Sequence, residues 1–194
     1  IGNYYAAQPS ALTVNDGLYK LFLKPSDKAG GEAAVLRTEP YIDGLTFEDH
    51  MKTGPAGSGD NGYIYAFPGQ YRAVLRGSIP QGSPEFAIKG ALPDPALFAA
   101  QSFGRYLTKA GINANKKPGK GAAPASGLQL VAETGSVPLR DVVKLTNKRS
   151  FNLYAELLLR HLGGGDPDAG LGAVKAFLAS AGADVSELDI VDGC

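Results

Sequence analysis

Few residues have types and spacing that can support chemistry, and most of these motifs lack the neighbouring sequence that their function requires. Residues 57–62 fit the G-x-G-x-x-G pattern of dinucleotide-binding loops, which needs a strand before it and a helix after it. Strand-like residues 63–65 follow instead, so we interpret the glycines as a hairpin loop. Residues 166–170 begin like a calcium loop, but Phe177 stands where the bidentate glutamate is needed. We interpret that segment as a turn and the start of a helix.

The usual metal ligands are also sparse. His50 and His161 lack the partner spacing of a metal site, and we expect both to be structural or solvated. Cys194 is the only cysteine, which excludes an intrachain disulfide and a zinc site built from cysteines. The sequence therefore predicts no metal and no cofactor.

Two tripeptides match motifs of catalytic serine enzymes. Ser150-Phe151-Asn152 matches S-x-N and Lys52-Thr53-Gly54 matches K-T-G. The penicillin-interacting serine enzymes carry S-x-x-K, S-x-N and K-T-G in that order. Here the K-T-G match precedes S-x-N in a segment rich in glycine and proline. We interpret it as a chance match in a loop.

The surroundings of Ser150-Phe151-Asn152 are more specific than the tripeptide. Residues 137–160 closely resemble the segment around S-x-N in class C low-molecular-mass penicillin-binding proteins, the D-alanyl-D-alanine carboxypeptidase/endopeptidase family. Three further segments resemble that family in the same chain order. Residues 1–12 resemble the entry to the last part of its inserted region, and residues 94–112 resemble its helix leading back to the catalytic domain. Residues 190–194 resemble the start of its D-G-S-G-L-S stretch, with cysteine for the first serine.

The resemblance implies a chemistry and a role for each motif residue. Enzymes of the family cleave peptide bonds of the peptidoglycan stem peptide through an acyl-enzyme, and the intact enzymes bind β-lactams. By the match of S-x-N, Ser150 relays a proton towards the leaving amine and Asn152 donates an amide hydrogen bond to the substrate backbone. Phe151 stands where a polar residue is often seen. A simpler interpretation of Ser150 is a helix-terminus residue that satisfies backbone donors.

The family's nucleophile has no counterpart in the sequence. No Ser or Thr is followed by Lys three positions later, and free serine needs such a base to attack. In the family, S-x-x-K precedes the inserted region and K-T-G follows the D-G-S-G stretch. We therefore expect the chain to be an internal fragment of a longer extracytoplasmic or periplasmic enzyme, inactive by itself. The alternative is a non-catalytic cell-wall binding or interaction module of the same architecture.

The elements that would position this site change character near residues 91–94. Before that boundary, branched and aromatic residues between turn residues predict a small antiparallel β unit. After it, apolar steps of three and four residues predict helices. The strands are expected at 18–23, 33–38, 63–67, 71–79 and 85–89, with one more allowed at 128–132. The helices are expected at about 95–110, 138–148, 152–162 and 168–181.

These patterns predict an α+β fold. The resemblance assigns residues 1–92 to the β-rich part of the inserted region and residues 93–194 to the α-rich part of the penicillin-binding domain. Helices without the sheet on which they pack would expose apolar faces, so we expect this chain to self-associate.

Composition narrows the classes of partner. The 194 residues include 19 Lys and Arg and 19 Asp and Glu, so the formal net charge is zero and nucleic acid is not expected as a partner. Hydrophobic residues make up 44% of the chain, which is enough for a buried core. The apolar runs are all shorter than the roughly 18 residues that would indicate a membrane span.

Overall fold

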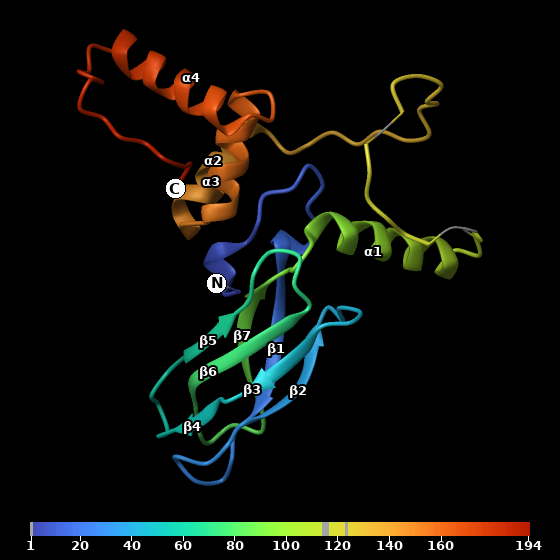
Figure 1. The fold of residues 1–194 in the computed structure, drawn as a ribbon, viewed down its shortest axis with the longest axis vertical. Coiled ribbons are helices and arrows are strands. Elements are labelled where there is room, and N and C mark those ends of the chain that lie inside the picture. The colour runs from blue at the N-terminus through green and yellow to red at the C-terminus, as the bar shows by residue number, and fades with distance from the viewer. Residues whose placement is uncertain (1, 114–116, 123) are drawn as a thin grey trace. The chain divides into compact units, whose positions relative to one another are not determined.

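The computed structural model describes residues 2–113, 117–122 and 124–194. The chain forms two compact units, Ile1–Ile112 and Asn113–Cys194, and each is described by itself (Figure 1). Strands occupy the first unit, and three of the four α-helices occupy the second. The predicted α+β fold is confirmed.

One sheet of the first unit is antiparallel. Its central strand β1 (Leu18–Lys24) pairs with β2 (Ala34–Glu39) on one side and with β7 (Phe86–Ala91) on the other. In β1, Leu21 and Leu23 are fully buried while Lys20 and Lys24 are exposed. This alternation is expected of a strand with one face on the core and one in water. Short 3-10 turns at Tyr4–Ala6 and Asn15–Gly17 precede the sheet.

The second sheet is mixed, which corrects the prediction of a purely antiparallel unit. Its central strand β6 (Arg72–Pro80) pairs antiparallel with β5 (Asn61–Tyr65). Two strands that the sequence analysis missed, β3 (Thr46–Asp49) and β4 (Lys52–Gly54), pair parallel with β6 in a single register. Strands of four and three residues are too short to show an alternating pattern, so their pairing is set by β6 and not by their own sequence.

The apolar faces of both sheets share one core. Its residues with at most 1% exposure include Leu21, Leu23, Met51, Ile64, Ala73, Leu75, Ile79 and Leu92. Helix α1 (Pro95–Lys109) adds Phe98 to this core and lies at the end of the unit where β1 begins (Figure 1). The compact unit therefore extends to Ile112, past the expected boundary at residues 91–94. The change from strand to helix does fall there, between β7 and α1.

The second unit contains a helical hairpin and a third packed helix. The helices are α2 (Leu139–Arg149), α3 (Asn152–Leu162) and α4 (Pro167–Ser180), each within one residue of its predicted bounds. The strand allowed at residues 128–132 does not form; Leu130 and Val131 are largely exposed and have no paired strand beside them in the described structure. Among the described residues, none of the helices has the length and hydropathy to cross a membrane.

Candidate active site

The turn that carries Ser150 and Asn152 joins α2 to α3. Ser150 ends α2 in the left-handed conformation, with φ 50° and ψ 59°. Its N–H and that of Phe151 both donate to the carbonyl oxygen of Thr146, the second over 3.1 Å. This is the Schellman type of helix end, in which glycine is the usual left-handed residue. A side-chain-bearing residue costs about 1–2 kcal/mol in this conformation.

The residue type at this position is unusual for its backbone. Three non-glycine residues of the described structure have positive φ, and they are Asn15, Asp16 and Ser150. Asn and Asp tolerate the left-handed region because their side chains bond locally to the backbone. Serine is not among the residue types that commonly adopt it. The backbone alone therefore does not account for serine at position 150, and strained residues of this kind gather at functional sites.

Helix capping does not account for the serine either. The N-cap residue of α3 is Phe151, and the structure shows no side-chain hydrogen bond capping that end. Ser150 belongs to the C-terminal end of α2, where the orphan backbone groups are carbonyls and not N–H donors. The simpler interpretation, in which Ser150 satisfies backbone donors, is thus not supported by the observed geometry.

Buried neighbours hold the turn in place. Thr146 is 7% exposed, and its hydroxyl donates to the carbonyl oxygen of Val142 over 2.8 Å. The Phe151 ring packs on the Tyr154 ring with 4.8 Å between centroids, and Leu153 is buried. Phe151, which stands where a polar residue is often seen in the family, therefore acts in local packing.

The predicted site residues share this one turn. Ser150 is exposed and Asn152 is half-buried as the first residue of α3. The α3 N-terminus contributes a partial positive charge beside them. Lys148 and Arg149, in the last turn of α2, add two cations. A hydroxyl, an amide and a positive field thus lie together where an anionic or carbonyl-bearing ligand can approach.

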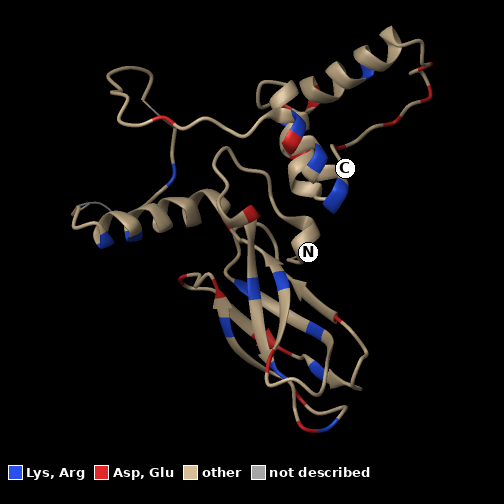
Figure 2. Ribbon diagram, turned by 180° about the vertical axis from the view of Figure 1, so that it is seen from behind, with Lys and Arg blue, Asp and Glu red and all other residues tan. Residues whose placement is uncertain are grey.

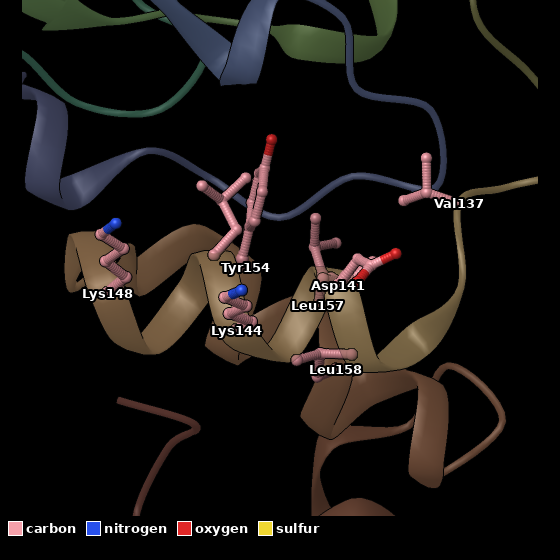
Figure 3. A pocket seen from close by; sticks show the side chains of 9 residues that line it. Val137, Asp141, Lys144, Lys148, Tyr154, Leu157 and Leu158 are labelled. Carbon is pink, nitrogen blue, oxygen red and sulfur yellow. The ribbon is translucent and has the colours of Figure 1, made fainter.

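An apolar groove of about 620 Å³ runs along the same helical hairpin (Figure 3). Its apolar lining comes from α2, α3 and the segment before α2: Val137, Val142, Leu145, Leu157 and Leu158. Asp141, Lys144, Lys148 and Tyr154 complete it. Neither Ser150 nor Asn152 lines the groove. The sequence analysis did not identify it, although the three-residue step from Val142 to Leu145 was a signal of an apolar helix face.

A half-buried carboxylate ties the D-G segment to α3. Glu156 accepts hydrogen bonds from the Arg160 side chain over 2.9 Å and from the Gly193 N–H over 3.1 Å. Asp192 accepts from the backbone N–H of Cys194 over 3.0 Å, which closes a local turn. The segment that resembles D-G-S-G therefore rests on α3.

The surroundings of Cys194 disfavour its thiolate form. Burial, followed by the negative charges of Asp192 and Glu156, raises the pKa of its thiol above the ordinary value. The reactive form of cysteine is the thiolate, which a raised pKa disfavours.

The K-T-G tripeptide forms strand β4 and not a loop, which corrects that part of the prediction. Thr53 is 2% exposed, and its hydroxyl oxygen accepts from the Ser26 backbone N–H over 2.8 Å. Lys52 pairs with Glu32 over 3.1 Å at the surface. The threonine is thus used for packing in the first unit, as expected of a chance match.

The remaining candidates from the sequence, the glycine-rich segment and His50, lie in a loop and in a carboxylate contact. Residues 57–60 form a loop that leads into β5, but β4 and β5 both pair with β6 and not with each other, so the loop is not a hairpin. His50 contacts the Glu48 carboxylate over 3.0 Å, and this contact, with Arg72, lowers the pKa of Glu48. In the described ranges, no three His, Cys, Asp or Glu side chains are grouped to hold a metal ion.

Charge is mixed in both units. Figure 2 shows Lys and Arg interspersed with Asp and Glu along the strands and loops of the first unit and along the helices of the second. This distribution agrees with a formal net charge of zero.

Solved structures show which fold the chain shares. It resembles penicillin binding protein 4 (dacB) from Haemophilus influenzae in complex with a novel β-lactam, with a TM-score of 0.72 and 21% identity over 97% of this chain. A second structure of that protein gives a TM-score of 0.70 and 20% identity over 100% of this chain. In both cases the chain spans 44% of the length of the solved protein.

The family comparison covers the complete sequence. The model of the D-Ala-D-Ala carboxypeptidase 3 (S13) family matches residues 1–194. That match agrees with the fold of the solved relatives. The chain belongs to the D-Ala-D-Ala carboxypeptidase 3 (S13) family.

Proposed function

We propose that this chain is part of a serine-type D-Ala-D-Ala carboxypeptidase/endopeptidase that cleaves peptidoglycan stem peptides through an acyl-enzyme outside the cytoplasm. The observation that carries the proposal is the left-handed Ser150 at the turn between α2 and α3, in a chain that matches the S13 family throughout. In this chain a serine stands where the backbone favours glycine. Its hydroxyl therefore has a use that glycine cannot supply.

The nucleophile and a functional K-T-G are proposed to come from other parts of a longer protein. This sequence contains no S-x-x-K. The solved relative is more than twice as long, since the chain spans 44% of it. In the complete enzyme, residues 1–92 belong to the inserted region and residues 93–194 to the penicillin-binding domain. We expect the chain alone to form no acyl-enzyme.

Within that enzyme, Ser150 and Asn152 act on the two sides of the scissile bond. The exposed Ser150 hydroxyl relays a proton to the leaving amine, a transfer that typically contributes about 10²–10⁴-fold to rate. The Asn152 amide donates a hydrogen bond to a backbone carbonyl of the substrate. Because the turn is fixed by Thr146 and the ring of Phe151, both groups are held before the substrate arrives.

The local charge suits such a substrate. A stem peptide that ends in D-alanine carries a carboxylate, and the acyl transfer develops negative charge on a carbonyl oxygen. The α3 N-terminus and the cations Lys148 and Arg149 lie at the turn. They favour binding of this anion, in the intact enzyme, over a cationic peptide end.

Fluorescent penicillin tests the proposal. The complete enzyme is expected to become covalently labelled, with one label per molecule and competition by unlabelled β-lactam. The 194-residue chain is expected to remain unlabelled under the same conditions. Covalent labelling of the chain alone would show that its nucleophile lies within these residues and would contradict the proposed division.

The alternative function is a non-catalytic cell-wall binding module, and the observation that favours it is the missing S-x-x-K. The gene around these residues discriminates the two. S-x-x-K encoded upstream and K-T-G downstream support the enzyme. Their absence, together with co-sedimentation of the protein with purified peptidoglycan, would favour the binding module.

A further inference from the structure

The D-G turn, residues 192–194, is held on α3 by a single carboxylate. Glu156 offers two acceptor oxygens, and each is used by a different donor: one by the Arg160 side chain and the other by the Gly193 N–H. The Glu156 side chain is 17% exposed, so these bonds are partly shielded from water. Hydrogen bonds to a charged group contribute more than neutral ones, especially where water is excluded.

Glycine at position 193 permits a very close approach to α3. A Cβ at this position would lie 2.6 Å from the carbonyl oxygen of Ala155 and 2.9 Å from the Cα of Glu156. Contacts under 3.0 Å with backbone atoms require the backbone to shift. The D-G turn and α3 are therefore matched in shape as well as in hydrogen bonding.

The contact lies on the face of α3 that carries Asn152. Residues four apart in a helix lie on the same face, one turn apart, so Glu156 lies one turn after Asn152. The D-G turn thus contacts α3 at Ala155 and Glu156, one turn after the residue proposed to bind the substrate backbone.

We infer that Glu156 is a positioning residue for the proposed reaction: it locks the D-G turn against α3 and so fixes the surface on which Asn152 meets the substrate. The inference rests on the proposed function. Two donors require two acceptors, so glutamine at position 156 would place an NH₂ group against either Arg160 or Gly193. A small displacement of a binding group is enough to slow catalysis, by about 100-fold for 1 Å.

The test uses three variants of the complete enzyme and the rate of acylation by fluorescent penicillin. Glu156→Gln removes one of the two hydrogen bonds, and Gly193→Ala displaces the turn while Glu156 stays in place. Glu187→Gln is the matched control, because it removes the same charge from an exposed site in the same unit. We expect the first two variants to be acylated about tenfold more slowly or worse and the control to be acylated at the wild-type rate.

The final amount of label separates positioning from folding. A positioning role lowers the rate constant while the labelled fraction still reaches one per molecule. A purely structural role lowers the labelled fraction and leaves the rate constant of the folded molecules unchanged, and that result would overturn the inference. A wild-type rate in Glu156→Gln would overturn it as well.

A second measurement distinguishes failure of this inference from failure of the proposed function. In the 194-residue chain, Glu156→Gln is expected to speed hydrogen exchange of the Gly193 amide at least tenfold, and Glu187→Gln is expected to leave it unchanged. Unchanged exchange in Glu156→Gln would contradict the lock itself. If the wild-type complete enzyme takes no label, the proposed function is wrong and the positioning role of Glu156 in it is wrong as well. The exchange rate of the Gly193 amide still shows whether Glu156 holds the turn.

Discussion

Ser150 combines a conformational cost with a proposed chemical role. Its φ of 50° belongs to a helix end that glycine would occupy without strain. Natural chains keep such residues where the surrounding structure fixes them and the strain has a function. Thr146, which accepts the N–H groups of Ser150 and Phe151, supplies that fixation here. At the residue scale, the proposed function therefore uses the hydroxyl at position 150 at a cost in stability.

Replacing Ser150 by glycine is expected to raise stability by relieving strain and to lower activity by removing the hydroxyl. Ser150→Gly and Ser150→Ala both remove the hydroxyl, but only glycine relieves the left-handed strain. We expect Ser150→Gly to be more stable than Ser150→Ala by about 1 kcal/mol, the cost of a Cβ in this conformation. Native-state amide exchange of α2 and α3 in the 194-residue chain measures the difference. An alanine variant at least as stable as the glycine variant would show that the observed φ is not a strained one.

Close helix packing positions the turn at the scale of elements. A Cβ at Gly170 of α4 would lie 2.3 Å from the carbonyl oxygen of Leu159 in α3, so the two helices touch through backbone atoms there. Leu159 is itself 5% exposed. The α3 helix is thus supported by α4 on one side and by the D-G turn through Glu156 on another. This support holds the body of α3, the helix that begins at Asn152.

Two glycines of the same helix test this packing. Gly170→Ala is expected to destabilise the α3 and α4 pair by about 1–3 kcal/mol, because the methyl group overpacks the contact. Gly172→Ala is the matched control, since a Cβ there meets open space. It is expected to stabilise α4 by about 0.5–1 kcal/mol through the better helix propensity of alanine. Amide exchange of α3 and α4 compares them, and equal effects of the two changes would contradict the described contact.

The sequence predicts the helices of this chain, which carry the candidate site, better than it predicts the strands. Periodicity and the caps at Asp94 and Asp166 place all four helices, since these signals are local. The sequence does not predict β3 and β4, because their parallel pairing with β6 depends on residues far along the chain. The packing of Phe98 from α1 onto the β core likewise has no signal in the sequence. The left-handed conformation of Ser150 and the Glu156 contact to Gly193 have no pattern in the sequence at all.

At the scale of the whole molecule, the helical unit exposes several large apolar side chains. Leu139, Leu145, Leu162 and Phe177 are each at least 40% exposed, and an apolar groove crosses α2 and α3. A proposed enzyme more than twice this length has further elements with which to cover such faces. Large exposed apolar patches favour association in their absence.

Self-association of the 194-residue chain is therefore expected to depend on the helical unit. The wild-type chain should show a mass that rises with concentration in light scattering coupled to size-exclusion chromatography. Leu145→Glu, which places a charge in the groove, should shift it towards monomer. Leu36→Glu on β2 is the control, because Leu36 has a similar exposure of 45% against 40% but lies in the first unit. A wild-type chain that stays monomeric at all concentrations would contradict this prediction.

The central claim is that the Ser150 hydroxyl takes part in acylation by the complete enzyme. Stopped-flow acylation of Ser150→Gly by saturating fluorescent penicillin tests it most directly, because this variant loses the hydroxyl without adding strain. The account predicts a rate constant at least about 100-fold below wild type, the lower end of what a positioned proton-transfer group contributes, with one label per molecule at completion. A rate constant within twofold of wild type would remove Ser150 from the mechanism.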